Sequence, residues 1–222
     1  MNDLLIQSLT KFFVGVLAIG TLLFVPAWSF SFWNGWLLMG ILFIPMLVIG
    51  IVLLIKAPDL LRKRLNGKEE QQEQRVVVAF SALLFIHCFV FAGLNWRFQW
   101  MVLPDAVVWI AAIIFLASYA MYAEVLRENA FLSRTVEVQE NQKVIDTGLY
   151  GIVRHPMYTA TTAMFLSMPL VLGSHISFVV MLSYILVVVK RILNEESVLE
   201  KGLKGYSDYK KRVKYRMIPF IW

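Results

Sequence analysis

The sequence predicts an all-α polytopic membrane protein, with one integral membrane domain over residues 1–222. Hydrophobic residues make up 59% of the chain and charged residues only 16%, whereas soluble domains carry about 25% charged residues. The mean hydropathy is +0.68. Apolar runs long enough to cross a hydrocarbon core of about 30 Å recur along the chain, with polar segments between them. Since no basic soluble domain is present, we expect membrane lipids as partners and no nucleic acid.

Six apolar segments are expected to cross the bilayer, and the fourth and fifth of them are marginal in length. They are Phe12–Phe30, Phe32–Ile55, Val76–Asn95, Ala106–Tyr122, Pro156–Leu172 and Ile176–Leu193. Ser31 alone separates the first segment from the second, which predicts a tight hairpin. Trp28, Trp33 and Trp36 cluster at its turn, as aromatic residues do at a membrane interface.

Basic residues are distributed unevenly among the polar segments. Lys56–Arg75 carries six of them, Ala123–His155 carries four and Lys190–Trp222 carries nine, whereas the opposite side of the predicted bundle carries only Arg97. By the positive-inside rule, both termini and all of the polar motifs are expected in the cytoplasm. The net charge of +6 then lies beside anionic lipid.

Two polar segments are long enough to form structure of their own. The first begins with Pro58-Asp59 and is expected to be a short helix at the membrane interface. In the second, Ser133–Val138 alternates apolar and polar residues, and Asn141 and Asp146-Thr147-Gly148 are typical of turns. We therefore expect a short hairpin or extended segment against the membrane face.

The densest polar motif is Arg154-His155-Pro156-Met157-Tyr158, followed about 40 residues later by Asn194-Glu195-Glu196. Proline suits the first turn of a helix, where its missing N–H has no cost. The motif can be a helix start with charges in the interface, or its free backbone N–H groups can form an anion site. Arg191 and Glu195 are four residues apart and can simply pair with each other. Taken together, the two motifs suit a ligand that carries both signs of charge.

These motifs, with Tyr150 and the endings Gly205-Tyr206-x-x-Tyr209 and Tyr215-Arg216-x-Ile218-Pro219, resemble the isoprenylcysteine carboxyl methyltransferase family. The superfamily of these enzymes includes the phospholipid N-methyltransferases. The resemblance covers residues 140–222 and implies S-adenosylmethionine as the cofactor, in a cytoplasm-facing pocket closed by the C-terminal segment. It divides the chain into N-terminal helices over 1–125 and a cofactor-binding core over 126–222.

The resemblance also implies which residues act. The cofactor-binding set is Gln142, Lys143, Val144, Ile145, Tyr150, His155, Pro156, Met157, Tyr158 and Glu195. Some members of the family carry histidine at the position of Gln142. An arginine that matches Arg191 belongs to the methyl-acceptor site of the family.

The chemistry of the residues agrees with such a ligand. A carboxylate can hold an ammonium group, tyrosine faces can accept a sulfonium, and apolar residues such as Val144 and Ile145 can contact an adenine ring. A carboxylate acceptor is already ionised and needs a cation to orient it, for which the guanidinium of Arg191 is suited. An amine acceptor must instead lose a proton, for which Glu196 is the candidate. Arg191 and Glu196 are therefore the candidate catalytic residues, and Arg191 favours a carboxylate on a lipophilic or lipidated acceptor.

Three other functions remain open on the sequence. A phospholipid amine N-methyltransferase would use the same cofactor, and an NADPH-dependent reductase of the sterol type would share the tyrosine–arginine–isoleucine–proline ending. A non-enzymatic membrane protein would bind neither cofactor. The chain has no dinucleotide or Walker motif. His87, His155 and His175 lack the spacing of metal ligands, so no metal is expected, and the lone Cys88 excludes an internal disulfide.

Overall fold

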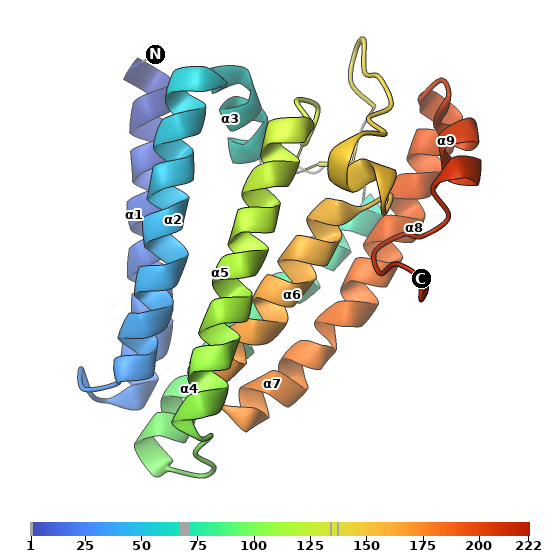
Figure 1. Ribbon diagram of the computed structural model, residues 1–222. Coiled ribbons are helices and arrows are strands. Elements are labelled where there is room, and N and C mark those ends of the chain that lie inside the picture. Colours follow the sequence, from blue (N-terminus) through green and yellow to red (C-terminus); the bar gives the residue numbers. More distant parts are fainter. Residues whose placement is uncertain (1, 67–71, 134, 137) are drawn as a thin grey trace.

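The computed structural model describes residues 2–66, 72–133, 135–136 and 138–222 (Figure 1). These residues form helices and no strand, apart from one isolated bridge between Val102 and Ser174. The helices are α1 (Asn2–Ala27), α2 (Trp33–Lys56), α3 (Pro58–Leu65), α4 (Gln72–Phe98), α5 (Asp105–Glu128), the 3-10 helix η1 (Gly148–Gly151), α6 (Pro156–Val171), α7 (His175–Leu182), α8 (Tyr184–Gly202) and α9 (Tyr206–Arg212).

The long helices run between two ends of one bundle (Figure 1). Helices α1 and α2 lie side by side and antiparallel, α5 packs along α6, and α7 continues into α8 after a break at Ser183. The N-terminus, α3, the segment 129–155 and α9 lie at the upper end in Figure 1. We call this end the polar end, because all of the sequence motifs lie there.

Five stretches of helix are long and apolar enough to cross a membrane. They are Asp3–Ala27, Trp33–Lys56, Val76–Phe98, Asp105–Glu128 and His175–Gly202. The predicted class of all-helical polytopic membrane protein is therefore confirmed for the described residues, whereas the predicted count of six spans is not.

The segment that falls short is α6, which has 16 residues and so extends only about 24 Å. The chain leaves this helix at Gly173, where φ is +69°, a left-handed conformation that ends many helices. The predicted segment Pro156–Leu172 is thus a real helix that crosses the bundle beside α5, but it is shorter than the other spans.

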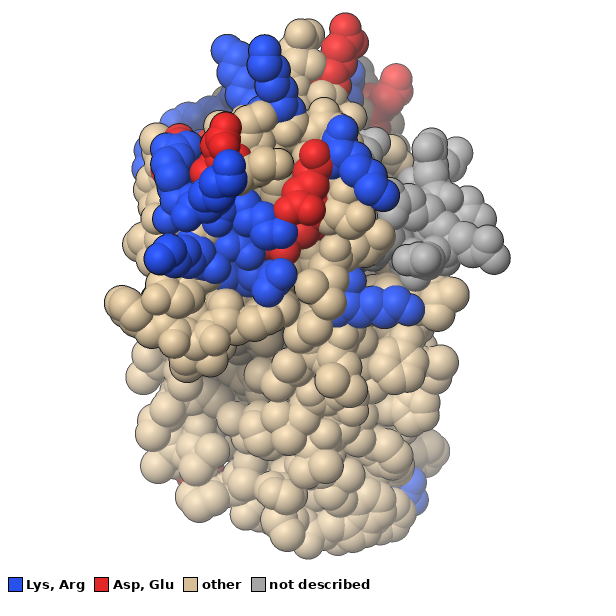
Figure 2. All heavy atoms as spheres, turned by 90° about the vertical axis from the view of Figure 1, so that its right-hand side faces the viewer, with Lys and Arg blue, Asp and Glu red and all other residues tan. Residues whose placement is uncertain are grey.

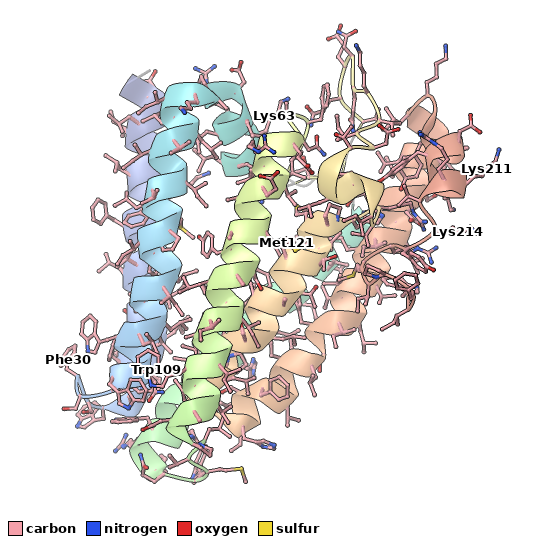
Figure 3. All side chains as sticks on the ribbon, viewed as in Figure 1. Phe30, Lys63, Trp109, Met121, Lys211 and Lys214 are labelled. Carbon is pink, nitrogen blue, oxygen red and sulfur yellow. The ribbon has the colours of Figure 1, made fainter. Side chains whose placement is uncertain are left out.

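The surface of the bundle agrees with a lipid environment. Large apolar residues such as Ile6, Leu17 and Ile55 are more than 60% exposed, which suits contact with lipid chains and not with water. Figure 3 shows Phe30 and Trp109 at the end opposite Lys63. Aromatic residues therefore gather at the end that lacks the polar motifs, as expected for a membrane interface.

Charged residues gather at the polar end. On the face that Figure 2 shows, lysine and arginine cover the upper part together with a few acidic residues, and the lower part is almost entirely neutral. Lys68 and Arg134, which contribute to the expected orientation in the membrane, lie outside the described residues.

The segment Ser133–Val138, expected as a short hairpin or an extended segment, has no strand among its described residues, and Arg134 and Glu137 lie outside them. The segment after α5 is held by side chains that bond to the backbone. The amide of Phe131 donates to Asn129 Oδ1 at 2.9 Å, and Gln139 Nε2 donates to the carbonyl of Phe131 at 2.6 Å. Such bonds offer the backbone an alternative to strand pairing.

Candidate functional site

A pocket opens at the polar end between the start of α6, the last turns of α8, α9 and the segment 129–145. It is lined by Gln142, Lys143, Val144, Ile145, Tyr150, His155, Met157, Tyr158, Glu195 and Arg191, which all appear among the sequence-predicted site residues. Pro156 opens α6 behind the pocket without lining it, and Glu196 does not line it either. One cavity therefore collects nine of the ten residues that were expected to bind a cofactor.

Tyr150 reaches the pocket from η1, which begins at a glycine. Gly148 has a φ of +51°, a left-handed conformation that favours glycine over residues with a Cβ. The Glu128 carboxylate accepts a hydrogen bond from the amide of Leu149 at 3.1 Å. These contacts fix η1 against the end of α5.

Tyr158 lies in the first turn of α6 and connects two residues of α8. Its hydroxyl donates to Glu195 Oε2 at 2.6 Å, and Arg191 Nε donates to the same hydroxyl at 2.9 Å. Residues four apart share a face of a helix, and here that face of α8 points at α6. The phenol therefore sits between the two charges that were expected to be able to pair directly, and it brings both to the pocket.

Glu196, the next residue, faces a buried cluster of cations. Its Oε1 accepts from Arg154 Nε at 2.8 Å and lies 3.3 Å from His155 Nε2, while its Oε2 accepts from Arg216 Nε at 2.9 Å. The side chains of Arg154 and Glu196 are only 3% and 4% exposed. A carboxylate held by two guanidinium groups is a weak proton acceptor, so this geometry also suits a positioning role, and the expected catalytic role of Glu196 stays a prediction.

The C-terminal segment is tied to the start of α6 by the same cluster. Arg154 Nη1 donates to the carbonyls of Val213 and Lys214 at 2.7 and 2.8 Å. The amides of Arg154 and His155 donate to the carbonyls of Tyr215 and Arg216 at 2.9 and 2.8 Å. The segment after α9 therefore lies across the first turn of α6, where it forms one side of the site.

Two tyrosines of α9 line the pocket and were given no role by sequence reasoning. The hydroxyl of Tyr209 donates to the carbonyl of Tyr150 at 2.7 Å. Tyr206 is 3% exposed, and its hydroxyl is buried without a hydrogen-bond partner in the described part of the chain. The spacing of the two tyrosines was visible in the motif Gly205-Tyr206-x-x-Tyr209, which could have indicated one face of a short helix.

A buried hydroxyl without a partner has a cost of about 1–3 kcal/mol, and a polar ligand in the pocket would supply the missing bond. Burial also raises the pKa of the Tyr206, Tyr209 and Tyr150 phenols above their ordinary value. These groups therefore stay neutral near neutral pH. The hydroxyls of Tyr206 and Tyr150 can serve as donors to a ligand, whereas that of Tyr209 already donates to the carbonyl of Tyr150.

Asn129 also lines the pocket and was not among the predicted site residues. Its Nδ2 donates to the hydroxyl of Tyr150 at 2.9 Å, and it ends α5. Among the described residues, no group of three or more His, Cys, Asp or Glu side chains is placed to hold a metal ion.

The part of the chain that forms most of this pocket is similar to a known protein family. Residues 103–204 match the phospholipid methyltransferase family, which is part of the membrane methyltransferase superfamily recognised in the sequence. The match runs from just before α5 to the end of α8, and so includes most of the residues around the pocket. The predicted resemblance to this superfamily is therefore confirmed over residues 103–204.

A second comparison concerns a reductase. A stretch of 91 residues, 40% of this chain, is 32% identical to a Delta(14)-sterol reductase of Mus musculus. It covers 22% of that protein, so the chain matches only about a fifth of the length of this relative.

Proposed function

We propose that this membrane protein, which resembles the phospholipid methyltransferases over residues 103–204, transfers a methyl group from S-adenosylmethionine to a lipophilic acceptor. The proposal rests on the two hydrogen bonds of the Tyr158 hydroxyl, which connect the carboxylate of Glu195 and the guanidinium of Arg191 at one pocket. A ligand with an ammonium, a carboxylate and a sulfonium matches such a pocket better than a neutral ligand does.

The residues around the pocket fit this cofactor. Glu195 offers a carboxylate for the ammonium group, and the buried, unpartnered hydroxyl of Tyr206 offers a donor. Val144 packs with Leu199 and Leu203 in an apolar cluster that can receive the adenine ring. When bound, the cofactor would supply an activated methyl group, and the task of the protein is to hold an acceptor in line with it.

Arg191 is the proposed acceptor-orienting residue. Its Nε bonds to Tyr158, so the plane of the guanidinium is held at the pocket. A guanidinium fork orients a carboxylate through two parallel hydrogen bonds. A carboxylate acceptor needs no base. Among the described residues that line the pocket, Glu195 is the only carboxylate, and it accepts a hydrogen bond from Tyr158. Glu196, behind the pocket, is held by Arg154 and Arg216. This arrangement favours O-methylation of a carboxylate.

Two alternatives rest on the comparisons. The match to the phospholipid methyltransferase family supports a lipid acceptor, for which an amine in the headgroup is the alternative. The match to a sterol reductase supports the reductase alternative, for which NADPH is the expected cofactor. Base treatment of the methylated product separates the first alternative from the proposal, because a methyl ester is cleaved by base and an N-methyl group is not.

Calorimetry on the detergent-solubilised protein tests the cofactor. S-adenosylmethionine and its demethylated product are expected to bind, and NADPH is not. Binding of NADPH without binding of S-adenosylmethionine rejects the proposal in favour of the reductase.

The proposed location of the site is the cytoplasmic side. The uneven distribution of basic residues supports it, and Figure 2 shows them gathered at the polar end on one face. Single cysteines at Lys210 and Gln99, in a variant with Cys88→Ser, are expected to react with an impermeant thiol reagent from opposite sides of the membrane. Reaction of both from one side contradicts this orientation.

A further inference from the structure

A second and larger hollow lies at the polar end, between α2, α3 and the last turns of α5. Its volume is about 730 Å³. Apolar side chains form its floor, among them Val52 and Leu53 of α2 and Leu126 of α5. Because Val52 is 46% exposed on the outside of the bundle, the hollow faces the region where lipid chains lie.

Basic residues stand at the rim of this hollow. Lys56 ends α2, Lys63 lies on α3, and Arg127 lies in the last turn of α5. Figure 3 shows Lys63 at the upper end, beside α3 and the top of α5. An apolar floor below a basic rim at one level of the bundle matches a bilayer lipid that has an anionic headgroup.

Acidic residues reduce this positive charge only in part. Arg127 pairs with Glu124 through a contact between its Nε and Glu124 Oε2 of 2.8 Å. Asp59 also lines the hollow, and its side chain is 88% exposed and lies 4.0 Å from Arg62. Lys56 and Lys63 therefore carry the net positive charge of the rim.

The hollow adjoins the cofactor pocket at one residue, because Phe131 lines both. Lys63 lies 5.6 Å from the centre of the Phe131 ring, and its Nζ donates to the carbonyl of Ala130 at 3.4 Å. Arg64, the next residue of α3, donates to the carbonyl of Ser133 at 3.0 Å and to the hydroxyl of Tyr122. Lys63 and Arg64 of α3 therefore hold the segment 130–133, which lies between the hollow and the cofactor pocket.

Buried apolar side chains pack between the hollow and the cofactor pocket. Leu60 and Leu126, which line the hollow, belong to the same buried cluster as Leu132 and Tyr150, which line the pocket. Met157 of the pocket packs against that cluster as well. The hollow and the pocket are thus separated by one layer of packed apolar side chains and by Phe131.

We propose that this hollow binds a bilayer amphiphile with an anionic headgroup, the chain against α2 and α5 and the head at Lys56 and Lys63. The methyl acceptor occupies this hollow before it passes Phe131 into the pocket, a role that rests on the proposed function. The headgroup site is independent of that function, because it follows from the apolar floor, the basic rim and the position of the hollow.

Native mass spectrometry of the full chain in detergent tests the headgroup site. The probes are dioleoylphosphatidylglycerol, which is anionic, and dioleoylphosphatidylcholine, which has the same chains and no net charge. The wild type is expected to retain the anionic lipid preferentially. The double variant Lys56→Gln/Lys63→Gln should lose this preference, with affinity for the anionic lipid roughly tenfold lower. Equal retention of the two lipids by the wild type overturns the proposal.

The matched control is Lys201→Gln/Lys204→Gln, which removes the same charge at the polar end away from the hollow. It should retain the anionic lipid as the wild type does. An equal loss in the control variant shows that only the overall charge matters, and this also overturns the proposal.

A second variant fills the hollow without changing charge. Val52→Trp is expected to displace the bound lipid and to raise KM for the acceptor several-fold, with unchanged affinity for S-adenosylmethionine in calorimetry. Ile44→Trp, at another exposed position of α2 outside the hollow, is its control. Unchanged lipid retention in Val52→Trp contradicts the site. If the wild type does not bind S-adenosylmethionine, the proposed function is rejected. The headgroup site is then accepted or rejected on lipid retention alone.

Discussion

Tyr158 donates a hydrogen bond of 2.6 Å to Glu195 and so joins the first turn of α6 to the polar end of α8. The same oxygen accepts from Arg191. One phenol therefore sets the distance between an acidic and a basic residue that both line the pocket. The position of the two charges depends on this hydroxyl more than on their spacing along α8.

Removal of that hydroxyl gives the first prediction. Tyr158→Phe keeps the ring but releases Glu195 and Arg191, so affinity for S-adenosylmethionine should fall about tenfold, the effect of one hydrogen bond to charged groups. Calorimetry measures it. The control is Tyr184→Phe, because Tyr184 is a buried tyrosine of α8 outside the pocket. Equal affinity in Tyr158→Phe and the wild type would show that the bridge has no part in binding.

Glu195 itself gives the second prediction. Glu195→Gln keeps the shape of the side chain and removes the charge that we propose holds the ammonium group. Loss of a charge-assisted hydrogen bond should weaken cofactor binding by roughly ten- to a hundred-fold. Glu200→Gln, on the same helix and paired with Lys210 at the surface, should leave affinity unchanged. A Glu195→Gln variant with wild-type affinity would falsify this assignment.

The buried cluster gives the third prediction, which separates two roles of Glu196. Glu196→Gln leaves Arg154 and Arg216 without their carboxylate, and breaking a buried ion pair is expected to destabilise the protein by about 3–5 kcal/mol. Thermal unfolding should therefore shift to clearly lower temperature. If Glu196 is instead a proton acceptor in the reaction, turnover is lost while the unfolding temperature hardly changes, and this result contradicts the positioning role.

Much of the site was predictable because its motifs have fixed spacings. His155, Met157 and Tyr158 lie at the first turn of one helix, and Arg191 and Glu195 lie one turn apart on another. Helical periodicity and the family resemblance together therefore predict that these residues share one pocket, as they do.

The parts of the site that the sequence did not predict depend on contacts between residues that are far apart along the chain. Arg154 bonds to the carbonyls of Val213 and Lys214, about 60 residues away, and no local pattern indicates such partners. The cations around Glu196 were not predicted for the same reason, because they come from two other segments. The bounds of α6 were predicted to within one residue, because the apolar run ends where the backbone turns at Gly173.

The unpartnered hydroxyl gives the fourth prediction. Tyr206→Phe removes a group that lacks a hydrogen bond among the described residues, so the free protein should be as stable as the wild type or slightly more stable. Affinity for S-adenosylmethionine should fall several-fold if the hydroxyl donates to the ligand. Tyr209→Phe is the contrasting variant, because it breaks the bond to the carbonyl of Tyr150 and should lower stability by about 1 kcal/mol. Equal affinities in Tyr206→Phe and the wild type exclude a role in binding.

The last prediction concerns the acceptor and uses Arg191→Lys. Lysine keeps the positive charge but lacks the planar fork, so it can attract a carboxylate without aligning it. Turnover should therefore fall at least about tenfold, because alignment supplies much of the rate in such a transfer, while cofactor affinity stays close to that of the wild type. The measurement combines a methyl-transfer assay on membrane extracts with calorimetry on the same protein.

Arg212→Lys is the matched control, because Arg212 pairs with Asp146 at the surface and exposed pairs of this kind contribute little. It should behave as the wild type in both assays. Near wild-type turnover in Arg191→Lys rejects the acceptor role. A parallel loss of cofactor affinity and turnover places Arg191 with Tyr158 and Glu195 in the cofactor site, and the acceptor must then be held by other residues.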